Sequence, residues 1–499
     1  GPSLKSRKEI KVQDTVKKDK IIDNFLKVAI VISSIFFVIP SIRYYMETGT
    51  ILNFKAYFQF LLNTEDRLVQ TAIYLLVFLL LTITYVFLIK RRKTAFKSIK
   101  SVLILVAIVS IVFIMAIPFM CSDVFYYLGV GRIDSNYGQN PYYTTIQDFV
   151  ETGDNVRYLQ EDTVLAQGYA NDWKDATVVY GPVWQLICKG VAFLSFGNID
   201  VGLLVFKIVN VLIHLFNCYL IWKITNKKMF TLIYGLNPFI LIEGISSVHN
   251  DMFVVMFILL AIYFLKNKKK ILPSVVFLSL GAGIKYFPII LLPFMIIYHF
   301  REEKPLKRFL ECIKYGIIFI LVLFVPYLIY IQDLNVMAGI FTQQEKLAKS
   351  IYILISEYFN KPENIVEITK TTLLGIFAII YFFICVVILN KKDIKFKNMM
   401  EKANCFLLPF IFLLITNFQP WYIMWLFPII MFQKPDTIKM ELGISLISEI
   451  ANSVFLVYTE GWRNGTPFIF IMLLGAFLML MYIKKERELR RKKAFLKNP

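Results

Sequence analysis

Charged residues are scarce in this sequence, and that scarcity indicates its class. Of the 499 residues 18% are charged, whereas soluble globular domains average about 25%. Hydrophobic residues make up 57% of the chain, and the mean hydropathy is +0.62. They occur in blocks of roughly 20, the length of helix that spans a bilayer. This composition excludes a soluble enzyme, a soluble DNA-binding protein and a disordered chain, and it predicts an all-α polytopic membrane protein.

Paired cysteines and common metal-ligand spacings are also missing. The six cysteines form no CxxC pair and lie mostly inside apolar runs, which predicts buried free thiols. Only Cys121 and Cys188 are placed to meet on an oxidising face. HExxH is absent as well. We therefore expect no required cofactor and assign no metal ligands, although Asp123 with Asp251 or His249 could still chelate a divalent ion.

Acidic residues are outnumbered by basic ones, and the net charge is +20. Most of the Lys and Arg residues lie in the two termini and in short loops between apolar segments, as expected for loops on the cytoplasmic side. The loop 121–181 is instead predominantly acidic, which predicts an extracytoplasmic position. The positive charge therefore indicates membrane orientation, and we expect no nucleic-acid partner.

Fourteen membrane spans are predicted, with both termini in the cytoplasm. A crossing at residues 182–198 would place every later basic loop outside, so this segment is predicted to be an interfacial or re-entrant helix on the outer face. The predicted spans are 24–45, 70–89, 101–120, 201–222, 229–246, 250–265, 271–287, 288–300, 311–331, 371–390, 402–418, 420–433, 438–457 and 467–483.

The predicted parts follow one another simply along the chain. The first apolar stretch lacks an A-x-A-like cleavage site, so it is expected to be an uncleaved first span. Gly1-Pro2 resembles the scar of a removed expression tag. The parts are a cytoplasmic basic tail (1–23), two extra N-terminal spans (24–100), a catalytic module (101–331) with its outer loop 121–200, a second outer loop (332–370), C-terminal spans (371–483) and a cytoplasmic basic tail (484–499).

Polar and aromatic residues gather at the predicted outer ends of the spans, where an apolar helix does not require them. Each has a structural explanation when taken alone. Asp123 could be a solvated acid, Asn250 or Asp251 a helix N-cap, and Lys285 a side chain that reaches the interface. The pair Trp421 and Tyr422 could belong to an aromatic belt. The acids from Asp148 to Asp175 are interpreted as a solvated loop surface. Their convergence on one face nevertheless favours a site.

The order of these motifs resembles that of the GT-C superfamily of integral-membrane glycosyltransferases, in particular bacterial polyprenol-phosphate-mannose-dependent mannosyltransferases. The residues that carry the resemblance lie between about 120 and 422. They are Ser122-Asp123 with Tyr126, Gly131-Arg132, Tyr137-Gly138 with Asn140-Pro141-Tyr142, Tyr180-Gly181-Pro182, Asn237-Pro238, His249-Asn250-Asp251 and Gln419-Pro420-Trp421-Tyr422. The two spans that precede the acidic loop depart from the pattern of many relatives.

The resemblance implies a GT-C-like fold and an inverting transfer of one sugar, mannose or a similar hexose, from a polyprenyl-phosphate donor to a lipid-linked or cell-envelope glycan. Such chemistry needs a base for the acceptor hydroxyl, for which we select Asp123. It also needs cationic or hydrogen-bonding groups for the departing phosphate. The candidates for that phosphate are Lys285, His249, Arg132 and Asn250. The candidates for substrate binding are Tyr126, Tyr142, Asp251, Trp421, Tyr422 and Gln419.

Two other classes of protein fit part of the pattern. A lipid or glycan transporter or flippase would also be polytopic, although its charged groups would be expected near the bilayer midplane. A polymer ligase that uses a lipid pyrophosphate would share much of the architecture. The abundance of Lys, Ile, Asn and Phe favours a bacterial plasma membrane. The distribution of charge between the loops predicts that the active site lies on the extracytoplasmic side.

Overall fold

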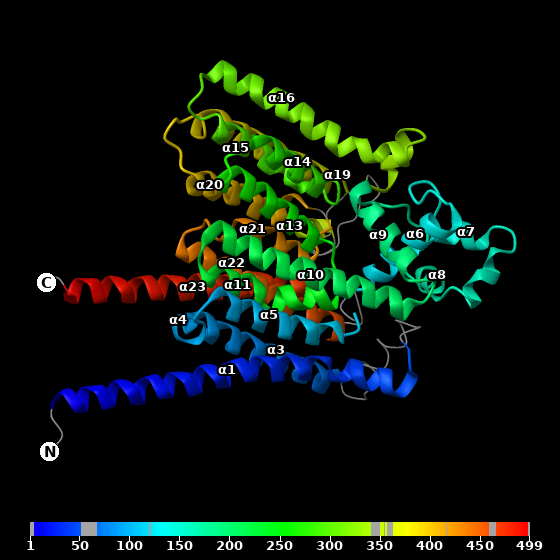
Figure 1. Cartoon of the computed structure of the whole chain (residues 1–499). Coiled ribbons are helices and arrows are strands. Elements are labelled where there is room, and N and C mark those ends of the chain that lie inside the picture. The colour runs from blue at the N-terminus through cyan, green and yellow to red at the C-terminus, as the bar shows by residue number, and fades with distance from the viewer. Residues whose placement is uncertain are drawn as a thin grey trace. The chain divides into compact units, whose positions relative to one another are not determined.

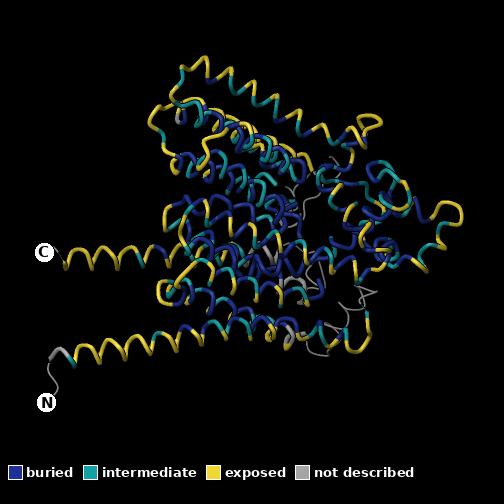
Figure 2. Tube along the Cα trace, in the orientation of Figure 1, coloured by how far each residue is buried: buried dark blue, intermediate teal, exposed yellow. Residues whose placement is uncertain are grey.

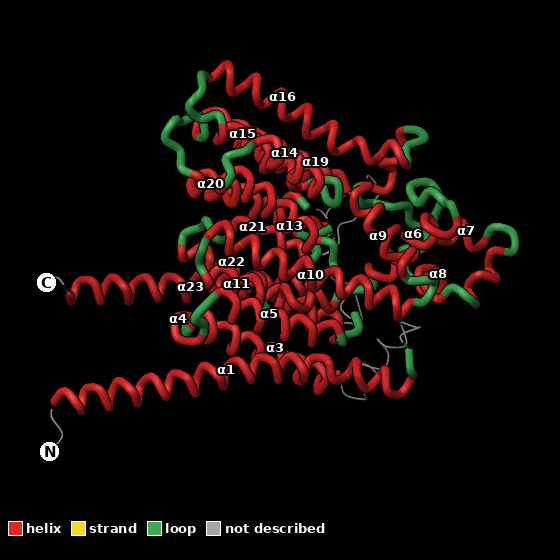
Figure 3. The backbone as a smooth tube through the Cα atoms, in the orientation of Figure 1, coloured by secondary structure: helices red, strands yellow, loops and turns green. Residues whose placement is uncertain are grey.

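The computed structural model describes residues 4–50, 67–118, 121–340, 350–353, 355–356, 363–415, 417–458 and 466–497. Within these ranges the chain forms helices and loops but no strand (Figure 3). The predicted all-α class is therefore confirmed. The chain divides into two units, Gly1–Phe119 with Phe206–Val248 and Met120–Val205 with His249–Pro499.

Five helices in the described part of the chain are long and apolar enough to cross a membrane, and a bent pair makes a sixth. Shorter apolar helices occupy several other predicted spans, such as Ile271–Ala282 and Phe287–His299. The count of fourteen spans stays a prediction. The long helices are Ser6–Thr48, Thr71–Lys90, Ile199–Thr225, Pro305–Ile329 and Glu363–Val387, and the bent pair is Lys228–Gly235 with Pro238–Ser246.

Buried polar side chains on the apolar helix α10 bind backbone carbonyls of neighbouring segments in the first unit. Lys207, Asn210 and His214 recur at helical spacing on α10 and are all buried. The Lys207 ammonium donates to the carbonyls of Ala116 and Ser246, and the Asn210 amide donates to Gly244. A broken helix leaves such carbonyls without an intrahelical partner, and within apolar surroundings they must be satisfied by neighbouring side chains. The elements of this unit are α1 (Leu4–Thr48), α3 (Arg67–Lys90), α4 (Arg92–Ala95), α5 (Ile99–Ile114), most of α10 (Ile199–Thr225), α11 (Lys228–Gly235), α12 (Pro238–Ile240) and the π-helix Leu241–Ser246.

The second unit holds the remaining helices, and its short helices α6 to α9 lie together beside the longer ones (Figure 1). The elements before residue 300 are α6 (Asp123–Tyr137), α7 (Ile146–Glu151), the 3-10 helix Asn155–Gln160, α8 (Thr163–Tyr169), α9 (Pro182–Leu194), α13 (Asp251–Ile262), the π-helix Tyr263–Asn267, α14 (Ile271–Ala282), the 3-10 helix Phe287–Ile290 and α15 (Leu291–His299). Those after it are α16 (Pro305–Phe324), the 3-10 helices Val325–Ile329 and Leu334–Met337, α18 (Ile351–Ile353), α19 (Glu363–Phe383), the π-helix Ile384–Ile388, α20 (Phe396–Pro409), the π-helix Phe410–Leu414, the 3-10 helix Pro420–Leu426, α21 (Phe427–Ile430), α22 (Pro435–Tyr458) and α23 (Thr466–Lys497).

Close packing of α6 against α9 fixes the helix that begins at Asp123. A Cβ atom on Gly131 would lie 2.3 Å from the carbonyl oxygen of Cys188, so only glycine allows the two backbones to approach this closely. The segment 182–198, which is predicted to stay on the outer face, contains α9, a helix of 13 residues. It is shorter than the roughly 20 residues that a span needs.

Three of the predicted parts contain helix that was not assigned from the sequence. The predicted tails 1–23 and 484–499 are largely helical, since α1 begins at Leu4 and α23 continues to Lys497. Lys, Arg and Glu are good helix formers, which explains why the helices continue into these exposed segments (Figure 2). The predicted loop 332–370 is also partly helical, because α19 begins at Glu363. Residues 341–349 of that loop lie outside the described ranges.

Candidate active site

Asp123 is the first residue of α6, and its side chain is half-buried. A carboxylate at a helix N-terminus is stabilised by the backbone N–H groups and dipole of that helix. The turn that precedes the helix is held from the acidic loop, where the Asn171 amide donates to the Ser122 carbonyl at 3.0 Å. The fold therefore fixes the position of this carboxylate.

A cavity of about 450 Å³ opens beside Asp123, within the second unit. Three stretches of chain that are far apart in the sequence line it, together with Gly339. The lining residues are Cys121, Ser122, Asp123, Tyr126, Asp172, Trp173, Asp175, Ala176, Thr177, Val179, Tyr180, Gly339, Asn417, Gln419, Trp421 and Tyr422. Four residues predicted from the sequence to bind substrate, Tyr126, Gln419, Trp421 and Tyr422, are brought together here.

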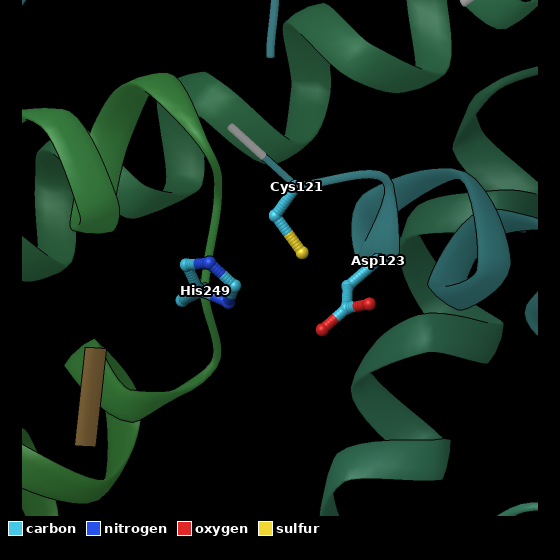
Figure 4. Close-up of side chains that lie close together, drawn as sticks. All are labelled: Cys121, Asp123 and His249. Carbon is cyan, nitrogen blue, oxygen red and sulfur yellow. The ribbon is translucent and has the colours of Figure 1, made fainter. Parts of the chain in front are cut away.

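His249 approaches Asp123 from the turn before α13 and is fully buried. Its ring stacks on Trp421 with centroids 3.9 Å apart and planes inclined by 18°. Figure 4 shows His249 with Cys121 and Asp123, and their potential ligand atoms lie within 4.8 Å of one another. The sequence indicated Asp123 with His249 as one chelating pair, but not the contribution of Cys121. Within the described part of the chain, these three residues form the group that could hold a metal ion.

Val248, just before His249, has a φ of 58°, which is a costly conformation for a β-branched residue. Such strain persists only where surrounding structure imposes it, and it is concentrated at functional sites. Next to His249, the Asn250 side chain is also fully buried, and neither of its amide atoms has a hydrogen-bond partner among the described residues. Asn250 thus retains both a donor and an acceptor.

Asp251, which is fully buried, pairs with Lys285, which is partly buried, close to the cavity wall. Lys285 Nζ lies 2.8 Å from Asp251 Oδ1, and Trp425 Nε1 donates to the same oxygen at 2.5 Å. The ammonium also lies 4.7 Å from the centre of the Tyr422 ring. Lys285, a predicted phosphate ligand, is therefore already paired with an acid, and Asp251, a predicted substrate ligand, is the acid that pairs with it.

The Tyr180-Gly181-Pro182 motif brings the acidic loop to this pair. A Cβ atom on Gly181 would lie 2.0 Å from the carbonyl oxygen of Gly283, two residues before Lys285. Gly181 also donates its backbone N–H to the carbonyl of Ile284 at 3.2 Å. The motif therefore positions Tyr180 at the cavity and close to Lys285.

Arg132 and Tyr142, two of the predicted site residues, do not line the cavity. Arg132 Nε donates to Asp162 Oδ2 at 2.6 Å, and Asp162 also caps α8 by accepting from the Leu165 amide. Tyr142 is buried against Tyr330, and its hydroxyl donates to the Tyr180 carbonyl at 2.8 Å. Arg132 connects α6 to the start of α8, and Tyr142 connects its own loop to the Tyr180-Gly181-Pro182 motif.

Tyr126 presents a hydrogen-bonding phenol beside Asp123. Its hydroxyl donates to the Ala176 carbonyl at 3.0 Å. Burial raises the pKa of the Tyr126 phenol above its usual value, and the nearby charges of Asp123 and Asp175 raise it further. The phenol is therefore neutral at physiological pH and cannot act as an anionic base.

Sequence reasoning missed several residues of the lining. Asp172 and Asp175 were interpreted as solvated surface, yet they line the cavity with Trp173 between them. The Trp173 amide donates to Asn171 Oδ1 at 2.9 Å, which completes a turn tied to the start of α6. The available signal was Trp173 itself. A large aromatic ring in an otherwise polar loop usually packs against other side chains, which would have indicated that this part of the loop is not simply solvated surface.

A family model described as alpha-(1->6)-mannopyranosyltransferase, N-terminal domain, matches residues 32–301. The match includes Asp123, the His249-Asn250-Asp251 motif and Lys285, and it ends before the Gln419-Pro420-Trp421-Tyr422 motif. No significant match was found among curated proteins or among solved structures. Because the matched region covers more than half of the chain, the resemblance inferred from the motifs is confirmed: the protein belongs to this family of mannosyltransferases.

Proposed function

We propose that this protein transfers a single mannose from a polyprenyl-phosphate donor to a lipid-linked or cell-envelope glycan acceptor, on the extracytoplasmic face and with inversion. The observation that carries the proposal is the position of Asp123. It is a fixed carboxylate on the wall of a cavity with aromatic and amide groups, in a chain of the mannosyltransferase family.

The proposed reaction needs one proton acceptor. The acceptor oxygen forms a bond to the anomeric carbon while the bond from that carbon to the phosphate oxygen breaks. The hydroxyl proton passes to the Asp123 carboxylate, and polyprenyl phosphate leaves with the bonding electrons. A positioned base of this kind contributes about 10²–10⁴-fold to the rate.

The cavity offers suitable surfaces for a sugar. Trp421 and Tyr422 provide flat rings on which the CH groups of a pyranose can pack. Gln419 and Asn417 supply amide donors and acceptors for hydroxyl groups. Gln419 Nε2 already donates a hydrogen bond to Asn417 Oδ1 at 3.1 Å. This combination of apolar faces and a few placed polar groups is typical of small-molecule sites.

For the donor phosphate we propose His249 and Asn250 as the nearest ligands. Both are fully buried and directly precede Asp251 in the chain, and the Asn250 amide donates to no group among the described residues. Lys285 contributes positive charge in this arrangement, although it shares that charge with Asp251. Arg132 is not included, because its guanidinium is bound to Asp162.

Release of polyprenyl phosphate from a polyprenyl-phosphate mannose, measured with purified protein and a glycolipid acceptor, tests the proposal. We expect Asp123→Asn and Asp123→Ala to lower turnover by about 10²-fold or more. Asp154→Asn is the matched control, since Asp154 is an exposed acid of the same loop. Near-wild-type turnover by folded Asp123→Ala would overturn the role of Asp123. Movement of intact donor across proteoliposomes without transfer would favour a transporter.

A further inference from the structure

The cavity is rich in negative charge, although the proposed donor is itself an anion. Asp123, Asp172 and Asp175 line it, and none of its described lining residues is Lys or Arg. The two cations predicted as phosphate ligands are already paired, Lys285 with Asp251 at 2.8 Å and Arg132 with Asp162 at 2.6 Å. A phosphate entering this site would meet repulsion from carboxylates at short range. A source of positive charge is therefore needed.

Three side chains at the edge of the cavity form a suitable set of metal ligands. Cys121 and Asp123 flank Ser122 at the start of α6, and His249 faces them from the turn before α13 (Figure 4). Their sulfur, oxygen and nitrogen atoms lie within 4.8 Å of one another. Bonds of about 2.0–2.3 Å to a tetrahedral ion place its ligands roughly 3.5 Å apart. Side-chain rotations that close about 1 Å would complete the site.

The chemistry of these ligands selects the type of ion. Mg²⁺ and Ca²⁺ prefer sites made only of oxygen atoms, whereas a thiolate with an imidazole favours Zn²⁺ or a similar transition-metal ion. Three protein ligands also leave one tetrahedral position open, as in catalytic zinc sites. The stacking of His249 on Trp421 fixes the plane of the imidazole, and such orientation of ligands by their neighbours strengthens metal binding.

We propose that Cys121, Asp123 and His249 bind one divalent transition-metal ion, of which Zn²⁺ is the best match. Its open position takes an oxygen of the donor phosphate, so that His249 acts on this phosphate through the ion. One oxygen of the Asp123 carboxylate binds the ion, and the other remains available to the acceptor hydroxyl. Binding of the ion does not depend on the proposed function, whereas its contact with a phosphate does. Cys121 thereby gains a role that the spacing of the sequence did not indicate.

Binding of the ion is tested on the full-length protein without substrate. After treatment with a chelator and dialysis against Zn²⁺, we expect about one Zn²⁺ per chain by elemental analysis. Replacement by Co²⁺ should produce the near-ultraviolet charge-transfer band of a cobalt–thiolate bond. We expect Cys121→Ser to abolish this band and His249→Gln to weaken Zn²⁺ binding at least 10-fold. Cys405→Ser, at an exposed cysteine, and His299→Gln are matched controls that should retain both signals.

Several results would overturn the proposal, and they differ from those that would overturn the proposed function. Absence of the cobalt band and of bound Zn²⁺ in the wild-type protein would refute the metal site whatever the variants do. A band that persists in folded Cys121→Ser would refute it also. Metal-free protein that transfers mannose at the full rate would remove the contact with phosphate and leave the transferase standing. Stoichiometric Zn²⁺ binding without transfer from any polyprenyl-phosphate mannose would refute the function and leave the site.

Discussion

Removal of the Lys285 ammonium should destabilise the protein through the acid that it leaves behind. Asp251 is fully buried and binds Lys285 Nζ at 2.8 Å. Breaking a buried ion pair by removing one partner costs about 3–5 kcal/mol, because an uncompensated charge remains. Trp425 still donates to the same carboxylate oxygen. We therefore expect Lys285→Met to lower the free energy of unfolding by about 3 kcal/mol, at the lower end of that range.

The same reasoning predicts recovery when the acid is neutralised as well. The double variant Lys285→Met/Asp251→Asn keeps a side-chain oxygen for Trp425 but removes the buried charge. Replacement of a buried pair by neutral groups is often close to neutral in stability. The midpoint of thermal unfolding in detergent should therefore fall by several degrees in Lys285→Met and return most of the way in the double variant.

Lys189→Met is the matched control for this experiment. Lys189 Nζ lies 3.3 Å from Asp134, but its side chain is 41% exposed, and Asp134 retains hydrogen bonds from Tyr330 and Gln185. We expect a loss of about 1 kcal/mol or less there. An unchanged unfolding midpoint in Lys285→Met, or a double variant no more stable than the single one, would refute the assignment of Lys285 as the counter-charge. Donor affinity of the stable double variant then measures any further contact of Lys285 with phosphate.

Three other changes have clear expected outcomes. Gly131→Ala forces a Cβ atom against a backbone carbonyl of α9 and should cost about 1–3 kcal/mol in thermal stability, whereas Gly190→Ala, with open space around it, should not. Trp421→Ala removes both a cavity wall and the ring that stacks on the imidazole, so KM for the donor should rise far more than in Trp421→Phe; equal values would contradict its role. Tyr126→Phe loses one hydrogen bond, about 1 kcal/mol. Because the pKa of the phenol is raised, this change should leave the alkaline limb of the pH–rate profile unmoved, and a shifted limb would show that the phenol titrates during turnover.

The broad outline of the fold and site could be predicted from the sequence because each depends on local signals. Apolar blocks predicted the helices. Residues 182–198, which the sidedness of charge predicts not to cross, contain a helix of only 13 residues, and their place on the outer face stays a prediction. Asp123 was selected as the first acid after a long apolar segment, and the structure places it on the cavity wall. Trp421 and Tyr422, almost 300 residues later, were predicted to join it and do so.

The residues that were missed or misplaced depend on contacts between distant segments. Arg132 and Asp162 are 30 positions apart, and Lys285 and Asp251 are 34 apart. Neither pairing leaves a periodic signal in the sequence. Cys121 and Asp172 look like an apolar thiol and a loop acid until the Asn171–Ser122 hydrogen bond brings their segments together.

The pairing of these cations changes how donor binding must be understood. A buried charge is stable only when another group neutralises it, so a buried lysine beside a cavity normally has an acid partner before any ligand arrives. An anionic donor can then gain attraction from a positive charge in two ways. It can draw Lys285 away from Asp251, which leaves a buried acid unpaired, or it can bind a positive charge that the chain does not itself supply. The first route predicts that Asp251→Asn tightens donor binding, because the lysine is released. The second predicts that Asp251→Asn leaves donor affinity unchanged while Cys121→Ser weakens it.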